Sequence, residues 1–246
     1  MSDRTTMIAD EKKRRSSTTS TAASDTVNGI IELIQAEGLG PGDQLQSEGV
    51  LAERFGVSRG TVRESVRALA QIGVLTVSNG RRPELAPING KNIAVLINHA
   101  VQTAQVSVLQ TWDLRQTLET RSVYLACLRR TDEQIARMNE IVDEMRVSVD
   151  DVEKLTDLDI RLHLLWAEAA ANPLFLLVQQ SLELVMRWTG PVGYAALGEF
   201  ETVREHIELH GQISDAIARR ATGTAVEKIT EHFNTARNCI IDSGFE

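Results

Sequence analysis

The stretch from Gln46 to Leu75 constrains the fold more than any other part of the chain. It reads QSEGVLAERFGVSRGTVRESVRALAQIGVL, two short amphipathic segments separated by Gly56, whose backbone freedom suits a tight turn. Ser47 and Ser58 precede the two segments, at positions where a serine hydroxyl caps the free N–H groups of a helix. The apolar residues of the second segment recur at helical spacing, at Val62, Val66 and Leu69. The pattern predicts two helices joined by a turn, an arrangement typical of proteins that read DNA.

A basic face and a β-hairpin extend this pattern. Between residues 54 and 82 the chain has six arginines and a single carboxylate, Glu64. Arginine suits the major groove because its guanidinium donates two hydrogen bonds to guanine O6 and N7. Val74–Val77 and Glu84–Pro87 have the composition of strands, and Asn79-Gly80 between them favours a hairpin turn. The sequence therefore predicts a winged helix-turn-helix.

Three further segments sharpen this interpretation: Gly40–Leu45 (GPGDQL), Ala52–Arg59 (AERFGVSR) and Thr61–Glu64 (TVRE). Together they resemble the GntR family of bacterial transcription regulators, over residues 26–87 of the chain. The wing, SNGRRP, is most similar to the FadR branch of that family. The resemblance implies a homodimer that binds an inverted repeat in double-stranded operator DNA.

The resemblance also implies which residues contact DNA. Two recognition-helix arginines reach base edges, two hydroxyls reach phosphate, and the wing tip lies near the minor groove. These residues are Arg59 and Arg63, Ser58 and Thr61, and Asn79, Gly80 and Arg81. Two positions depart from the family pattern: Gly49 stands where an arginine usually follows the Ser-Glu pair, and Gly60 lies inside the recognition helix. Each change leaves the motif intact but alters what is expected of the operator sequence.

Length and charge limit the number of domains and the part of the chain that can bind DNA. A chain of 246 residues suits about two domains. The net charge is −8, yet residues 1–90 hold eleven basic and eleven acidic side chains, so the excess of acid lies in residues 91–246. DNA binding should therefore localise to the arginine face of the first part.

Two cysteines, Cys127 and Cys239, lie in separate apolar patterns and are expected to be reduced and buried. No stretch is long and apolar enough to span a membrane, so we expect a cytoplasmic protein.

Four regions follow from these patterns. Residues 1–24 are expected to form a disordered basic and Ser/Thr-rich tail, with Ser24 or Asp25 capping the first helix. Residues 25–87 form the winged helix-turn-helix, and residues 88–92 form a linker. Residues 93–242 show only helical periodicity, so we expect an all-α bundle of six to seven helices. Its predicted helices cover 91–104, 108–128, 132–147, 151–171, 173–188, 199–220 and 222–242. This second domain resembles the FadR C-terminal (FCD) effector domain.

Histidines carry the chemistry of the second domain. Asp159 and His163 are four residues apart and share a helix face. His210 and His232 lie on the apolar stripes of two later helices, so three imidazoles and a carboxylate are expected to point inward. Such a set suits a divalent transition metal, zinc first, with nickel or manganese also compatible. These four residues match the metal-binding subgroup of the FCD domain. Asp157 competes with Asp159, and His206, one turn before His210, competes with His210.

Arg115 and Glu119 lie four residues apart in the segment WDLRQTLETR. They form either a surface ion pair or part of a ligand site, in which Arg115 binds a carboxylate through two hydrogen bonds. The second possibility predicts a small carboxylate-bearing metabolite as the effector.

Three functions are compatible with the sequence. The preferred one is a metabolite-responsive, non-enzymatic transcription regulator, more specifically a repressor. A metal-dependent hydrolase is an alternative because a three-histidine, one-carboxylate site can leave a position for water, but the chain has no HExxH arrangement to supply a base. The other alternative is a constitutive DNA-binding protein with a purely structural metal.

Overall fold

The structure is a computed structural model and describes residues 22–242. The chain divides into two compact units, with the boundary between Ile88 and Asn89. Each unit has its own apolar core. Within the described residues, no helix is long and apolar enough to cross a membrane.

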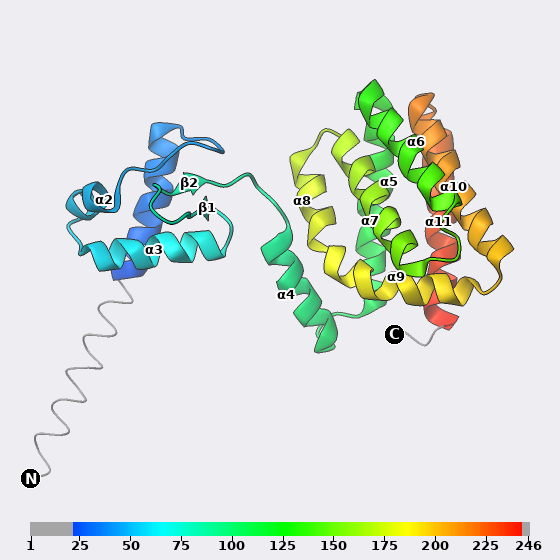
Figure 1. Ribbon diagram of the computed structural model, residues 1–246, viewed down its shortest axis with the longest axis horizontal. Coiled ribbons are helices and arrows are strands. Elements are labelled where there is room, and N and C mark those ends of the chain that lie inside the picture. The colour runs from blue at the N-terminus through cyan, green and yellow to red at the C-terminus, as the bar shows by residue number, and fades with distance from the viewer. Residues whose placement is uncertain (1–21, 243–246) are drawn as a thin grey trace, which may run out of the picture. The chain divides into compact units, whose positions relative to one another are not determined.

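The first unit is a winged helix-turn-helix (Figure 1). Its elements are a helix over residues 22–37, α2 (Glu48–Phe55), α3 (Arg59–Gln71), β1 (Leu75–Thr76) and β2 (Glu84–Leu85). Ser47 and Ser58 cap α2 and α3, each accepting a hydrogen bond from a backbone N–H three residues later. Gly56 ends α2 with φ of 66°, a left-handed conformation that glycine adopts without strain. The two caps and the turn are therefore formed by the residues that the sequence indicated.

Two details of this unit differ from the prediction. Residues 22–24 are already helical, so neither Ser24 nor Asp25 caps the first helix, and residues 1–21 of the predicted tail lie outside the described residues. The strands of the wing are only two residues each, paired antiparallel as Leu75 with Leu85 and Thr76 with Glu84. The other edge of β2 bonds the segment before α2: the N–H of Leu85 donates to the carbonyl of Asp43.

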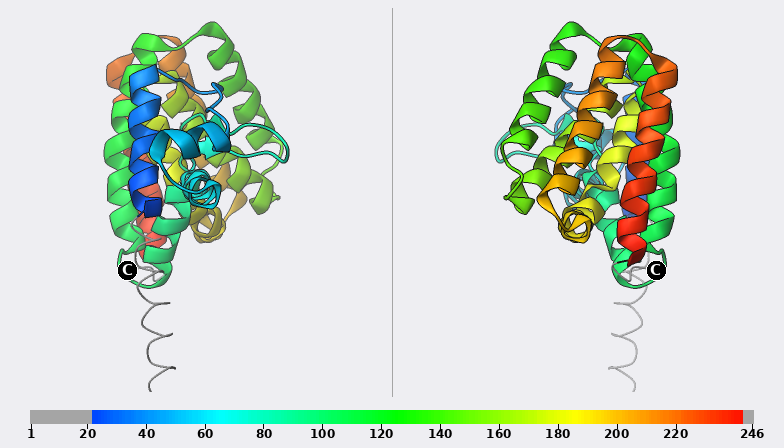
Figure 2. Two further views of the ribbon diagram at one scale, coloured as in Figure 1. Left: turned by 90° about the vertical axis from the view of Figure 1, so that its left-hand side faces the viewer. Right: turned by 90° about the vertical axis from the view of Figure 1, so that its right-hand side faces the viewer.

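The second unit is an all-α bundle. Its helices are α4 (Lys91–Gln102), α5 (Val108–Arg129), α6 (Asp132–Arg146), α7 (Val152–Ala169), α8 (Pro173–Ser181), α9 (Glu183–Leu197), α10 (Phe200–Ala218) and α11 (Thr222–Asp242). The helix α11 packs against both α5 and α10, and α7 packs against α5, α6, α8 and α9. Figure 2 shows α10 and α11 side by side in its right-hand view. The core between these helices is continuous and includes Trp166 and Phe233, both almost fully buried.

The bundle has one helix more than the upper limit expected from sequence. The predicted helix 173–188 is in fact two helices, because α8 ends at Ser181 and α9 begins at Glu183. The segment 190–198, predicted as a break, is helical through Leu197 and contains Pro191. Gly190 allows this path, since a Cβ atom there would lie 2.8 Å from the side chain of Thr156 on α7. Close packing against the side chain of Thr156, rather than a loop, explains this glycine. The predicted linker 88–92 is also shorter, because α4 already begins at Lys91.

Candidate functional sites

Three histidines meet in the centre of the bundle. His163 comes from α7, His210 from α10 and His232 from α11, and their side chains are 0 to 2% exposed. One ring nitrogen from each lies within 4.8 Å of the other two. Helix packing therefore brings together residues that are up to 69 positions apart in the chain.

Asp159 lies beside this cluster, one turn before His163 on α7. Its Oδ1 lies 2.8 Å from the Nε2 of His210 and 3.7 Å from the Nε2 of His163. Both nitrogens are buried, and neither has a partner in hydrogen-bond geometry among the described residues; the same holds for the Nδ1 of His232. Buried nitrogens without partners are unfavourable unless something else bonds them. Asp157, the competing aspartate, instead lies 3.4 Å from Arg187 in a more exposed ion pair.

The second ring nitrogens of His163 and His210 are held in place. The Nδ1 of His163 bonds to the Oε2 of Glu119, and the Nδ1 of His210 lies 2.9 Å from the backbone carbonyl of His206. A carboxylate or carbonyl acceptor places the proton of a neutral imidazole on Nδ1 and leaves the lone pair on Nε2. Both Nε2 atoms are thus prepared to bind a cation near Asp159. Hydrogen bonds of this kind accompany most metal-binding histidines.

The electrostatics favour uncharged imidazoles at His206 and His232 and an ionised carboxylate at Asp159. Burial, followed by the proximity of His210, lowers the pKa of His206 to about 3, and burial likewise lowers the pKa of His232 well below its ordinary value. Burial alone would raise the pKa of Asp159, but His163 and His210 outweigh it and hold that pKa well below the usual range. Neutral imidazole and ionised carboxylate are the forms that bind metals.

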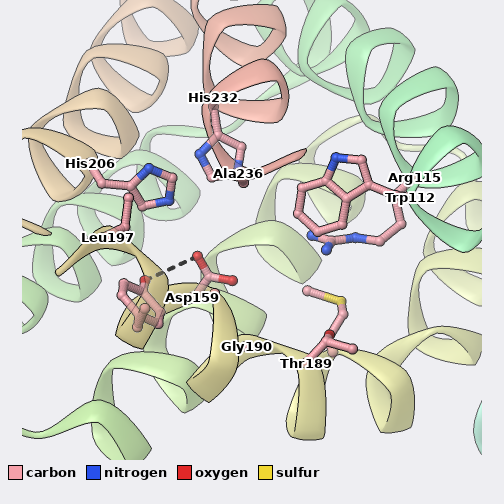
Figure 3. A pocket seen from close by; sticks show the side chains of 12 residues that line it. Trp112, Arg115, Asp159, Thr189, Gly190, Leu197, His206, His232 and Ala236 are labelled. Carbon is pink, nitrogen blue, oxygen red and sulfur yellow. Dashed lines mark hydrogen bonds between the residues drawn. The ribbon is translucent and has the colours of Figure 1, made fainter. Parts of the chain in front are cut away.

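A cavity of about 50 Å³ adjoins the cluster, enough for more than one water molecule. Figure 3 shows Asp159 near His206 and His232 toward one side of the cavity, with Arg115 and Trp112 on the other. Met186, Tyr194 and Leu197 supply further lining. The cavity is thus apolar in part, and its polar lining includes Arg115, Asp159, Thr189, His206 and His232.

Arg115 is buried, so the predicted possibility of a surface ion pair is wrong. Its Nε lies 3.0 Å from the Oε1 of Glu119, with the side chains 6% and 2% exposed. The Nε2 of Gln179, on α8, donates to the same oxygen of Glu119 at 2.7 Å. Burial would raise the pKa of Glu119, but His163 and Arg115 outweigh it and hold that pKa below its ordinary value. Sequence reasoning found Glu119 only as a partner of Arg115 and missed both its bond to His163 and the part of Gln179.

His206, the competitor of His210, lines the cavity without joining the three clustered nitrogens. Its ring stacks on that of His232, with centroids 4.7 Å apart. Its Nδ1 is buried and has no partner among the described residues. His99 is exposed on α4.

The predicted DNA-contacting residues lie at the start of α3 and at the tip of the wing. Arg59 and Arg63 are exposed, one turn apart on α3. The hydroxyl of Ser58 caps α3 and lies 2.9 Å from that of Thr61. The wing residues Asn79, Gly80 and Arg81 are exposed, and Gly80 has φ of 74°.

Comparison with known families agrees with both units. Residues 23–83 match the family described as bacterial regulatory proteins, gntR family, and residues 110–235 match the FCD domain. The chain belongs to the gntR family, with an FCD domain. It is a transcriptional regulator of the FadR type.

Individual relatives match over most of the chain. The chain is 27% identical over 208 residues to the HTH-type transcriptional repressor NanR of Salmonella arizonae, covering 83% of this chain and 78% of that protein. NanR of Salmonella typhimurium matches to the same extent. Among solved structures, Streptococcus agalactiae GntR has a TM-score of 0.69 at 22% identity, over 88% of this chain and 99% of that one. The structural likeness establishes the fold.

The cluster of the FCD domain fits a transition metal. Three imidazole nitrogens and one carboxylate oxygen form a borderline donor set that suits zinc, nickel or manganese. The fit rests on the converging nitrogens without partners, together with the bonds that orient His163 and His210.

Proposed function

We propose that this regulator is a repressor that binds operator DNA as a homodimer and releases it when a small carboxylate-bearing metabolite occupies the FCD domain. The observation that carries the proposal is the convergence of one buried nitrogen from each of His163, His210 and His232 in the bundle core, with Asp159 beside two of them, next to a cavity that Arg115 also lines. The NanR relatives, which are named as repressors, support the direction of control.

The proposed DNA surface consists of the start of α3 and the wing tip. Arg59 and Arg63 would read base edges, because guanidinium groups match guanine in the major groove. Ser58 and Thr61 would contact phosphate, and Asn79, Gly80 and Arg81 would lie near the minor groove. Support comes from the exposure of the two arginines, of Ser58 and of the wing tip, with Thr61 half-buried beside them.

The proposed metal ligands are Asp159, His163, His210 and His232, with zinc as the first expectation and nickel or manganese as alternatives. When bound, such an ion acts as a Lewis acid and attracts an anionic ligand. Arg115 is suited to orient the carboxylate of that ligand. Its Nε bonds to Glu119, which leaves the two terminal nitrogens to bind a carboxylate bidentately.

The test measures binding of the full-length, metal-loaded protein to a labelled duplex taken from its own upstream region, by fluorescence anisotropy, against a panel of small organic acids. We expect at least one acid to weaken DNA binding by roughly 5- to 150-fold, the range of ordinary allosteric coupling. The same acid should have little effect on Arg115→Ala. The matched control is Arg121→Ala, an exposed arginine on the same helix, which should respond like the parent.

Two outcomes would contradict the proposed function and support another one. DNA binding that no acid alters, in protein that retains its metal, would identify the site as structural and the protein as a constitutive DNA binder. Turnover of an ester or amide by the metal-loaded protein, lost in His163→Ala, would identify a hydrolase instead.

A further inference from the structure

The recognition arginine Arg63 is not free in the absence of DNA. Its Nη2 lies 2.9 Å and its Nε 3.1 Å from the Oε2 of Glu48, and its Nε lies 3.3 Å from the Oε1. Glu48 is the first residue of α2, so the pair joins the two helices of the helix-turn-helix. The carboxylate therefore occupies the side of the guanidinium formed by Nε and Nη2.

This pairing leaves one defined edge of Arg63 for a ligand. A planar guanidinium has five N–H donors, and two of its edges can make a forked pair of hydrogen bonds. With the Nε and Nη2 edge bonded to Glu48, the edge formed by Nη1 and the second proton of Nη2 remains. A fork of this kind matches O6 and N7 of guanine.

The second recognition arginine is also positioned by α2. A Cβ atom at Gly49 would lie 3.3 Å from the Nη2 and 3.5 Å from the Cζ of Arg59, so the guanidinium of Arg59 rests against the backbone at Gly49. Any side chain at position 49 would press on it. Gly49 thus accounts for a departure from the family pattern: the absent side chain leaves the space that Arg59 uses.

The Glu48–Arg63 pair is expected to add only modestly to stability. Its side chains are 31% and 55% exposed, and ion pairs at such exposure contribute little to folding. A carboxylate on a DNA-reading surface also opposes binding, because it repels phosphate regardless of sequence. Discrimination increases only if the correct sequence offsets this penalty, through the base contact of the oriented Arg63, while wrong sequences do not.

We infer that Glu48 is a specificity-determining residue. It orients Arg63 so that one edge of the guanidinium faces a guanine, and it suppresses binding to other DNA. Gly49 leaves the space in which the guanidinium of Arg59 lies. The inference rests on the proposed function, since it requires that Arg63 read a base. The expected ligand is a half-site containing guanine in the major groove. Removing Glu48 should then raise affinity for arbitrary DNA and lower the preference for the operator.

The experiment selects duplexes from a randomised pool with the full-length protein and measures affinity for the selected and for arbitrary duplexes. We expect Glu48→Ala to reduce the ratio of these affinities about tenfold, within the range of one bidentate base contact. Affinity for arbitrary duplex should rise, and an unchanged affinity would contradict the suppression of binding to other DNA. In an Arg63→Ala background, Glu48→Ala should leave the preference at that base pair unchanged, because the arginine that it orients is absent.

Matched variants distinguish the effect of orienting Arg63 from the effect of removing a negative charge from α2. Glu53→Ala removes an exposed carboxylate from the same helix and should keep the full preference of the parent. Gly49→Ala should weaken preference at the base pair read by Arg59 alone. Melting curves confirm that each variant is folded.

The outcomes are distinguishable. A parent protein that selects no motif would overturn the proposed function itself. A parent that selects a motif, together with a Glu48→Ala variant that selects it with equal discrimination, would overturn only the inference. Equal losses in Glu48→Ala and Glu53→Ala would also overturn it, since charge alone would then explain the effect.

Discussion

At the scale of single residues, the two ring nitrogens of His163 have different environments. Its Nδ1 bonds to Glu119, and its Nε2 faces the cluster without a partner. His210 repeats this division with a backbone carbonyl in place of the carboxylate. The protein fixes the orientation of these rings before a cation arrives, which reduces the ordering that binding requires.

The first prediction at this scale concerns His163→Ala. We expect protein purified without chelator to carry close to one transition metal ion per chain, and the variant to lose it, because one of four ligands is removed. The variant should also melt at a lower temperature, since an ion that binds only the folded state stabilises it by mass action. Elemental analysis and thermal melting measure the two effects.

The control for this prediction is His206→Ala. His206 lies one turn from His210 on the same helix and is also buried, but it stands outside the three clustered nitrogens. The variant should retain the metal even if the lost ring packing lowers its melting temperature. Metal lost from His206→Ala but kept by His163→Ala would show that the ligand set is wrong.

The site was only partly predictable at this scale. Spacing along a helix predicted that Asp159 and His163 share a face, and the apolar stripes of two later helices predicted that His210 and His232 point inward, as they do. Their role as metal ligands stays a prediction. Gln179 was not identified. Its bond to Glu119 joins residues 60 positions apart on different helices, and no periodicity within one helix encodes such a contact.

At the scale of elements, α8 joins the candidate site to the start of α4. Gln179 donates to Glu119, which bonds both His163 and Arg115. The next residue, Gln180, accepts the backbone N–H of Gly90 at 3.0 Å. A Cβ atom at Gly90 would lie 2.5 Å from two backbone atoms of α8, so this glycine is in direct contact with that helix.

Gly90→Ala tests this connection. The added methyl group must displace α4 from α8, and overpacking of this kind typically costs about 1–3 kcal/mol. We expect a lower melting temperature and a smaller effect of the acid effector on DNA binding, with effector affinity itself nearly unchanged. Denaturation and anisotropy titrations measure these quantities.

Gly223→Ala is the matched control, because a Cβ atom there meets nothing within 4 Å. It should behave like the parent protein in both assays. A Gly90→Ala variant with parental stability and a parental response to effector would show that the contact between α4 and α8 carries neither packing energy nor coupling.

The elements themselves were predictable to different degrees. The boundary at Asn172 and Pro173 was recognised because proline disfavours helix in the residue before it. The division between α8 and α9 was not, and α9 continues through Gly190 and Pro191 where the sequence favoured a break. Glycine marks loops and close helix contacts alike, and only the proximity of Thr156 distinguishes the two.

At the scale of the whole molecule, regulation requires that ligand binding to one unit change the free energy of DNA binding by the other. Five residues, 86–90, join β2 to α4, so the connection is short. A ligand that binds equally well to the DNA-competent and DNA-incompetent states shifts neither population. The effector must therefore discriminate between the two states, and in a dimer a modest change in the spacing of two recognition helices suffices, because DNA half-sites have fixed helical spacing.

The last prediction follows from thermodynamic linkage between these two binding reactions. If the effector lowers affinity for operator by some factor, operator must lower affinity for effector by the same factor, typically 5- to 150-fold for roughly 1–3 kcal/mol of coupling. Calorimetric titration of the effector into metal-loaded protein, with and without saturating operator, measures this factor directly. Arg115→Ala and metal-stripped protein should both bind the effector more weakly, because each lacks one of the proposed contacts. Equal effector affinities with and without operator, or unchanged affinity in both altered proteins, would contradict a mechanism in which the metabolite binds at Arg115 and the metal to release DNA.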